Sequence, residues 1–229
     1  MDSVELNKRI DKVGNLLNFV HDTNTIKNLF DARNITISII AVNVENFFIA
    51  LKLSDSLLDV KYCKANFTDE LEVKHLETLN FNYHGFIRDG FFNSIFIVIE
   101  NHFRQLAEHY QVRESDSIKL VFKRLSENMI FESITEQEKK VFYFMCYLRN
   151  TMHNIGLQTK DNSYLDIHDA NSIFENQKIT LSLTKDSFNS INFDGFMLLI
   201  EQVIKLVIRI NQLMPQDDII THRLKNVYV

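Results

Sequence analysis

Arginine and histidine lie one helical turn apart near the end of a strongly apolar segment, VFYFMCYLRNTMHNIG, residues 141–156. Arg149 and His153 are four positions apart, and side chains with this spacing project from the same face of a helix. A guanidinium can bind phosphate oxygens through two hydrogen bonds. An imidazole titrates near neutral pH and can move protons. The pair therefore indicates phosphate chemistry.

The same pair also has a purely structural interpretation. Cationic side chains in the last turn of a helix are favoured by the helix dipole, and Asn154 followed by Gly156 suits the end of a helix. Asn150 and Asn154 form a second polar row beside the pair, which suits either interpretation.

One acidic residue, Glu100, lies within a long apolar segment that precedes the motif. A carboxylate in such a place needs a partner, because burying an unpaired charge is costly. Two partners are compatible with the sequence. Glu100 positions Arg149, or it pairs with Arg104 one turn further along its own helix.

The segment LRNTMHNIG, residues 148–156, resembles the signature of HEPN-domain proteins, an all-helical superfamily that contains many metal-independent ribonucleases. In weaker form the resemblance extends over residues 81–214. It includes a central apolar helix with the acid Glu100, the motif helix, a variable polar segment and a long closing helix. This sequence departs from the family in having only three residues between Arg149 and His153, fewer than usual. That spacing leaves a non-cleaving relative as an alternative.

The resemblance implies a mechanism and partners. Two motif helices would face each other in a homodimer and form a composite site. Arg149 would bind the scissile phosphate, Asn150 would orient Arg149 or the phosphate, and His153 would be the general acid or base. The product would carry a 2′,3′-cyclic phosphate, with no metal or cofactor needed. A role as a toxin or phage-defence effector, controlled by an antitoxin or regulatory protein, follows from the family alone.

Basic residues upstream of the motif are the candidates for RNA binding. Lys139 and Lys140 precede Arg149 on the motif helix, and Lys123 and Arg124 lie on the preceding helix. They could form a local basic rim. The alternative is that they are the solvated faces of amphipathic helices.

The elements that must position these residues follow from the hydrophobic pattern. Apolar spacing predicts helices over residues 3–20, 35–60, 81–110, 136–153 and 193–214. The start of the second is strand-like by propensity, but its length favours a helix. Another helix opens at residues 68–71. Gly85 and Gly90 would mark the start of the central helix or a close packing contact.

The polar segment 157–185 differs from the rest, and alternation at residues 179–184 predicts a β-hairpin or ordered loop. The predicted fold class is therefore all-α, a bundle of long antiparallel helices with a small hairpin insertion near residues 163–184. We expect a single domain over residues 1–229, in which N-terminal helices at 1–67 pack on a HEPN-like bundle at about 68–214.

Composition supports this fold class and limits the function. The 229 residues include one proline and five glycines, too few for the many turns of an all-β fold. The formal net charge is −5, so RNA binding would require a local basic patch. No Walker loop, GxGxxG, GxSxG or HExxH motif appears, which argues against nucleotide hydrolysis, dinucleotide redox chemistry and serine hydrolysis.

Cysteine usage and the N-terminal segment predict a cytoplasmic protein. Cys63 and Cys146 stand apart in apolar helical context, as reduced buried thiols do. They are too far from His102 and His109 in the sequence to indicate a metal site, so none is expected. The polar start is no signal peptide, and polar residues interrupt each apolar stretch before a bilayer span, so no membrane partner is expected.

Three functions remain in competition. The first is a metal-independent endoribonuclease that acts as a homodimer. The second is a non-catalytic helical protein of the same fold that binds partners, with Arg149 and His153 serving as caps. The third is a nucleotide-sensing module in which Arg149 holds a phosphate without cleaving it.

Overall fold

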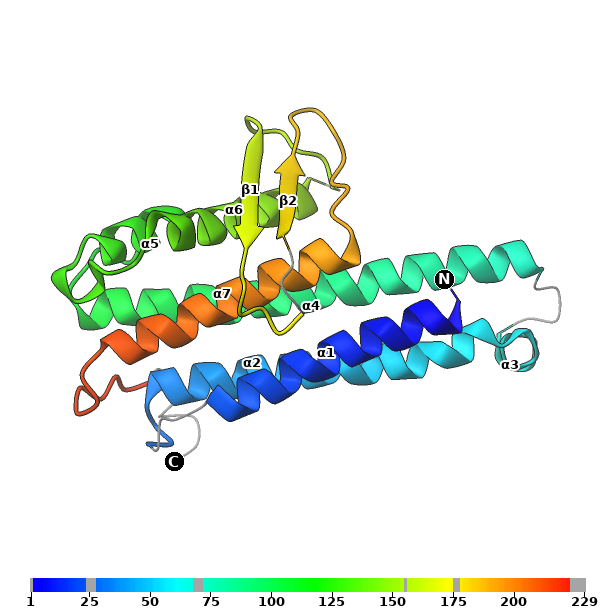
Figure 1. Ribbon diagram of the computed structural model, residues 1–229, viewed down its shortest axis with the longest axis horizontal. Helices are drawn as coiled ribbons and strands as arrows, with labels where there is room; N and C mark the ends of the chain where they lie inside the picture. The colour runs from blue at the N-terminus through cyan, green and yellow to red at the C-terminus, as the bar shows by residue number, and fades with distance from the viewer. Residues whose placement is uncertain (1, 24–27, 68–71, 155, 175–177, 223–229) are drawn as a thin grey trace.

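The computed structural model describes residues 2–23, 28–67, 72–154, 156–174 and 178–222. Within these ranges the chain forms α-helices and one two-stranded sheet, which confirms the predicted mostly helical fold with a hairpin (Figure 1). The elements are α1 (Ser3–Thr23), α2 (Ala32–Leu53), α3 (Val60–Asn66), α4 (Val73–His109), α5 (Ile118–Ser126), α6 (Glu136–His153), β1 (Ser163–His168), β2 (Lys178–Leu183) and α7 (Phe193–Leu213), with short 3₁₀ helices at Ser54–Leu58 and Met129–Phe131.

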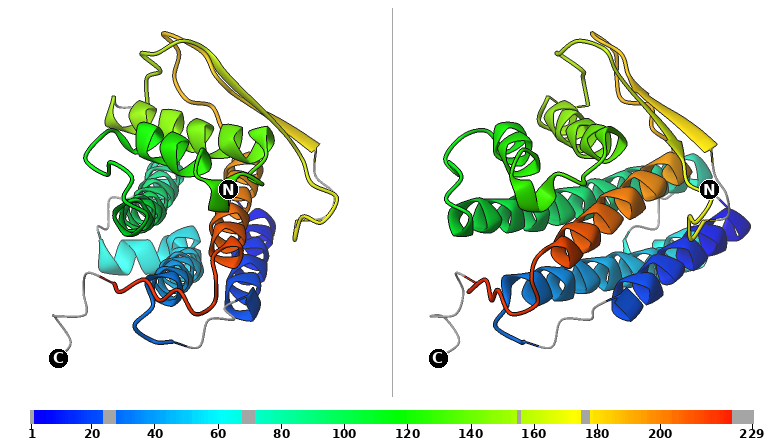
Figure 2. Two further views of the ribbon diagram at one scale, coloured as in Figure 1. Left: turned by 90° about the vertical axis from the view of Figure 1, so that its left-hand side faces the viewer. Right: turned by 60° about the vertical axis from the view of Figure 1, so that its left-hand side comes forward.

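The helices are stacked in layers, as Figure 2 shows. Helices α1 and α2 pack on each other and form one layer, and α2 also packs on α4. Helices α4 and α7 lie in the middle, and α5 and α6 cover their other side. Because both of its sides are covered, the middle layer has to be strongly apolar. Helix α7 meets this requirement, since most of its residues are buried.

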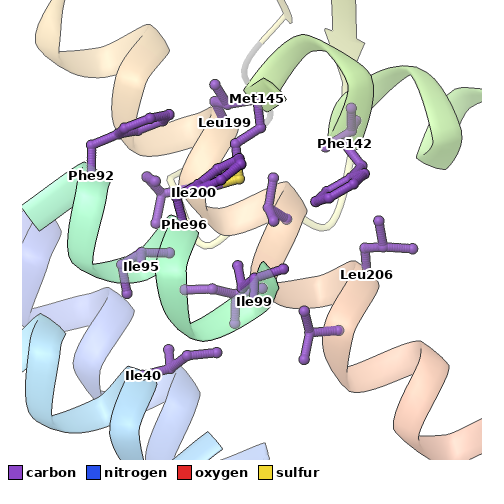
Figure 3. Close-up of a cluster of buried hydrophobic side chains, with 14 of the residues drawn as sticks. Ile40, Phe92, Ile95, Phe96, Ile99, Phe142, Met145, Leu199, Ile200 and Leu206 are labelled. Carbon is purple, nitrogen blue, oxygen red and sulfur yellow. The ribbon is translucent and has the colours of Figure 1, made fainter. Parts of the chain in front are cut away.

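The core lies where α4 and α7 cross between the outer layers (Figure 3). Side chains from four helices meet there: Ile40 of α2, Phe92, Ile95, Phe96 and Ile99 of α4, Phe142 and Met145 of α6, and Leu199, Ile200 and Leu206 of α7. The buried hydrophobic cluster is continuous from Leu6 to Ile220. The N-terminal helices therefore share one core with the motif helix.

Helix α2 has the length and composition of a membrane span. The stretch Ala32–Leu58 has a mean hydropathy of 1.6 over its most apolar window, and 44% of that window is buried in the protein. The sequence expectation that polar residues interrupt each apolar stretch before a bilayer span does not hold for this helix, because the many isoleucine, valine, alanine and phenylalanine residues between the polar ones keep its mean hydropathy high. A core helix passes the same test, and one face of α2 packs on α1 and α4.

The helix predicted to open at residues 68–71 and the central helix predicted at 81–110 form one continuous helix, α4, of 37 residues. Residues 68–71 themselves lie outside the described ranges. At 1.5 Å per residue α4 extends for about 55 Å. Gly85 and Gly90 lie inside it, and a Cβ atom built on either would meet nothing within 4 Å. The expectation that they mark a helix start or a close contact is therefore wrong. Packing of the apolar side chains around them outweighs the propensity cost of about 1 kcal/mol per glycine.

The hairpin forms where it was predicted. Strands β1 and β2 are antiparallel, with Ser163 opposite Leu183 and His168 opposite Lys178. Alternate residues face inward, and Leu165, Ile167, Leu181 and Leu183 are buried. The sheet packs on α6 and on the start of α7, where a Cβ atom at Gly195 would lie only 2.6 Å from Leu181 Cδ2. Glycine at this position therefore lets the hairpin approach the helix.

A buried ion pair lies at the start of α2, and its arginine also binds the segment after α7. Asp31 and Arg33 are each 1% exposed and form two hydrogen bonds, of 3.0 and 2.7 Å. Arg33 also donates to the carbonyl oxygens of Pro215 and Asp218, each at 3.0 Å. The hydrogen bond with Asp31 raises the pKa of Arg33 above its ordinary value. The hydrogen bonds described for the Arg33 guanidinium all go to atoms of this chain, so this arginine has a structural role.

Candidate functional site

Helix α6 places Arg149 and His153 one turn apart at its C-terminal end. The helix begins at a capping box, in which the hydroxyl of Thr135 accepts a hydrogen bond from the backbone of Glu138 and the Glu138 carboxylate accepts one from the Thr135 backbone. It ends at His153, as the apolar spacing predicted. Both ends of the motif helix are thus set by local sequence.

The guanidinium of Arg149 packs on an aromatic ring of the central helix. Its carbon lies 5.3 Å from the centre of the Phe96 ring, within the range of a cation–π contact. Arg149 is half-buried, and within the described part of the chain it has no carboxylate partner. Its hydrogen-bond donors are therefore available to an anion from outside the protein, while Phe96 limits where the side chain can go.

His153, by contrast, is exposed on the last turn of α6. Asn150 is half-buried, and Asn154 is the exposed residue that follows the helix. The Asn154 side-chain amide donates to the hydroxyl of Thr159 at 3.2 Å. Gly156, with φ of +84°, donates its backbone N–H to Thr151 at 2.7 Å. Asn154 and Gly156 therefore close the helix, while His153 and Asn150 remain beside Arg149.

The carboxylate of Glu100 is bonded to Arg104, one of the two partners that the sequence left open. Its Oε1 accepts from Arg104 Nη2 at 2.6 Å and from Arg104 Nε at 3.1 Å. Glu100 still lies close to the motif helix. Both Glu100 and Arg149 influence the pKa of the Cys146 thiol, which burial raises to about 12. Glu100 thus borders the site without a hydrogen bond to Arg149 among the described contacts.

The predicted RNA-binding lysines have different surroundings. Lys139 is half-buried and forms an ion pair with Glu136 at 2.7 Å, whereas Lys140 is exposed. A lysine that the sequence did not single out, Lys119 of α5, lies closer to the motif. Its amine donates to the Tyr147 hydroxyl and lies 4.5 Å from the centre of that ring. This contact depends on the packing of α5 against α6, so no local pattern indicates it.

A surface groove with a volume of about 600 Å³ runs beside the contact between α5 and α6. We call it the α5–α6 groove; it is lined by Ser117, Lys119, Leu120, Lys123, Ser126, Glu127, Glu136, Lys139 and Tyr143. Spacings of three and four residues place Lys139, Tyr143, Tyr147, Asn150 and Asn154 along one face of α6. This face ends at Asn150 and Asn154, the polar row beside Arg149 and His153. Its three lysines outnumber its two glutamates, although the whole chain is acidic.

The residues described contain no group of three or more histidine, cysteine, aspartate or glutamate side chains arranged to hold a metal ion. Both cysteines are buried and free. Comparison of the chain with models of known protein families, with characterised proteins and with solved structures finds no match. The site must therefore be interpreted from its own chemistry.

Proposed function

We propose that this protein is a metal-independent endoribonuclease in which Arg149 and His153 carry the reaction. One observation supports this proposal above the others. A guanidinium without an ion-pair partner among the described residues rests on Phe96, one helical turn from an exposed imidazole. This arrangement provides an anion-binding group and a proton-transfer group on one face, which is what cleavage of a phosphodiester requires.

The reaction would use the substrate's own ribose as the nucleophile. Arg149 binds the non-bridging oxygens of the scissile phosphate and stabilises the charge that builds up on them. His153 accepts the proton of the 2′-hydroxyl as its oxygen attacks phosphorus. The bond from phosphorus to the 5′ oxygen breaks, and that oxygen receives a proton. The products are a 2′,3′-cyclic phosphate and a 5′-hydroxyl.

A homodimer that brings two α6 helices together would supply both proton-transfer groups. His153 would act as the base, and the partner's His153 would protonate the leaving oxygen. The α5–α6 groove would hold flanking phosphates, with Lys119, Lys123 and Lys139 as the contacts. Binding should weaken steeply with salt, because these lysines displace counterions from the RNA backbone.

A second candidate is binding of RNA or a nucleotide without cleavage. It is favoured by the position of Glu100, whose carboxylate is held by Arg104 and so does not orient Arg149. A site with a phosphate-binding arginine and no fixed catalytic geometry would retain ligand without turning it over.

The test is cleavage of a labelled mixed-sequence RNA by the purified protein in EDTA. His153→Ala should lower the cleavage rate by a factor of about 10²–10⁴, the usual contribution of a general acid or base. His168→Ala, which removes an exposed histidine from the hairpin, is the matched control and should cleave at the wild-type rate. Equal rates for wild type and His153→Ala would contradict the proposed mechanism.

Binding of the same RNA, measured by fluorescence anisotropy, separates the two candidates when the RNA ends are analysed as well. Both candidates predict that Arg149→Ala loses affinity, and only an endoribonuclease should in addition leave cyclic phosphate ends on the RNA that it binds, an activity that His153→Ala removes while it keeps the affinity. If the folded wild-type protein binds RNA through Arg149 yet produces no cyclic phosphate ends, the non-cleaving alternative is supported instead.

A further inference from the structure

A second cavity lies at the other end of the central layer, where α1, α2, α4 and the start of α7 meet. Its volume is about 510 Å³, within the range of cavities that hold small organic molecules. We call it the α4 pocket; it is lined by Glu5, Arg9, Phe47, Leu51, Asn80, Phe81, His84, Gly85, Arg88, Asn192 and Phe193. His84 and Phe96 are twelve residues apart on α4, so this pocket is about 18 Å along the helix from the ring under Arg149.

Two buried polar atoms of this pocket have no hydrogen-bond partner among the described residues. They are Nδ2 of Asn80 and Nε2 of His84, whose residues are 4% and 9% exposed. Burying a polar group without a partner costs about 1–3 kcal/mol, and native proteins contain few such groups. Because both atoms belong to residues that line one cavity, we infer that their partners are supplied from outside the chain, with a small shift of the two side chains.

The charges around the pocket limit what those partners can be. Arg9 and Arg88 contribute two positive charges to the lining and Glu5 one negative charge, which leaves a single net positive charge. Arg9 donates to Glu5 at 3.0 Å, and its guanidinium carbon lies 4.7 Å from the centre of the Phe193 ring. Arg88 pairs with Asp89 at 3.1 Å. With Asp89 counted, the charges beside the pocket cancel, so a multiply charged phosphate is disfavoured relative to a group that carries at most one negative charge.

His84 contributes a neutral hydrogen-bonding group to the α4 pocket. Burial, followed by the nearby charge of Arg9, lowers its pKa to about 4, so the imidazole is uncharged at pH 7. In one of its tautomers Nε2 donates a hydrogen bond. The amide nitrogen of Asn80 can only donate. The polar side of the pocket is therefore rich in donors and suits an acceptor group.

The remaining walls are apolar and largely aromatic. Phe47 stacks on Phe91 with ring centres 4.4 Å apart, which holds one wall in place. Leu51 and Phe193 complete the inner surface, and Phe81, 79% exposed, lies at the edge. These walls match a flat or branched hydrocarbon body.

We propose that the α4 pocket binds a small monocarboxylic acid with an aromatic or branched apolar body. The carboxylate accepts hydrogen bonds from Asn80 Nδ2 and His84 Nε2 and pairs with the arginine side, while the body packs against Phe47 and Phe193. This site is separate from the α6 motif and does not depend on the proposed ribonuclease activity.

The first test is thermal unfolding of the full chain with benzoate, phenylacetate and 3-phenylpropionate, each compared with its primary amide and with phenyl phosphate. At least one acid should raise the midpoint by roughly 5–10 °C at about a hundred times its Kd. Its amide should raise the midpoint less. The proposal is overturned if no acid stabilises the protein, if acid and amide act equally, or if phenyl phosphate binds more tightly.

Variants then locate the binding. Asn80→Leu and His84→Phe should each weaken the best acid about tenfold, as expected for losing a hydrogen bond to a charged group. Without ligand, both variants should be at least as stable as wild type, because an orphaned polar atom has been removed. Asn82→Ala, at an exposed position on the same helix, is the control and should bind like wild type. Unchanged affinity in both pocket variants would overturn the assignment.

A second readout does not require any variant to fold. The pKa of His84, followed by NMR of its imidazole protons, should rise when the acid is added, because a neighbouring carboxylate favours the protonated ring. A pKa that does not change on addition of an acid shown to bind would place that acid elsewhere.

Discussion

The imidazole of His102 has no exposed surface and connects three helices. Its Nε2 and the Oδ1 of Asn211 on α7 are 2.8 Å apart, and its Nδ1 and the hydroxyl of Thr36 on α2 are 3.1 Å apart. Since Oδ1 can only accept, Nε2 carries the proton and Nδ1 accepts from the hydroxyl. Burial lowers the pKa of His102 to about 4. The network therefore requires the neutral ring.

This network makes stability depend on pH. An unfolded histidine takes up a proton as pH falls through about 6.5, whereas the native His102 does so only near pH 4. Stability should therefore fall by about 3 kcal/mol from this residue as pH drops from 6.5 to 4. In urea unfolding at pH 7 and pH 4.5, His102→Gln should lose less stability with acid than wild type does. The control is His168→Gln, and equal losses for His102→Gln and wild type would contradict this account.

The residues of the candidate site could be predicted only as far as local geometry decides them. Arg149 and His153 follow from a spacing of four on a helix, and the structure places both on α6. The partner of Glu100 was open between two arginines, because the sequence does not say how far α4 lies from α6. Lys119 and the pair Asn80 and His84 were missed, since their surroundings arise from residues distant in the chain.

At the scale of elements, α4 carries two glycines that its packing does not require. Gly90 is exposed, and a Cβ atom there would meet nothing within 4 Å. Gly90→Ala should therefore stabilise the protein by about 1 kcal/mol, because alanine restricts the unfolded chain and favours the helix. Chemical denaturation measures the change. Gly195→Ala is the contrasting variant and should not stabilise, since its Cβ atom would crowd Leu181.

The longer elements were predictable because their apolar periods are long and distinct, whereas the short helix α3, Val60–Asn66, lies where no helix was predicted. Alternation of apolar and polar residues predicted β2. Apolar residues spaced three and four apart predicted the long helices, including α2 with its strand-like first residues. The glycines of α4 were misinterpreted, because local propensity says nothing about the packing that holds a 37-residue helix together. The predicted bounds of α6, residues 136–153, were exact.

For the whole molecule, the proposed reaction requires two copies of α6. We expect sedimentation equilibrium to give twice the mass of one chain at the concentrations where RNA is cleaved. Cleavage per mole of protein should rise with concentration and then level off as the dimer forms. A monomer whose activity per mole is independent of concentration would contradict the composite site while leaving Arg149 and His153 as candidates.

The ion pair of Asp31 and Arg33 also affects how the chain folds during synthesis. The carbonyl acceptors of Arg33 lie 182 and 185 residues later in the sequence. While the ribosome is still translating α7, this guanidinium lacks both of them, and the start of α2 cannot be fully desolvated. Contacts of such long range close late in folding. The Arg33 guanidinium at the start of α2 should therefore stay hydrated in the nascent chain until residues 215–218 emerge, even though α1 and α4 are already present to cover the apolar face of α2.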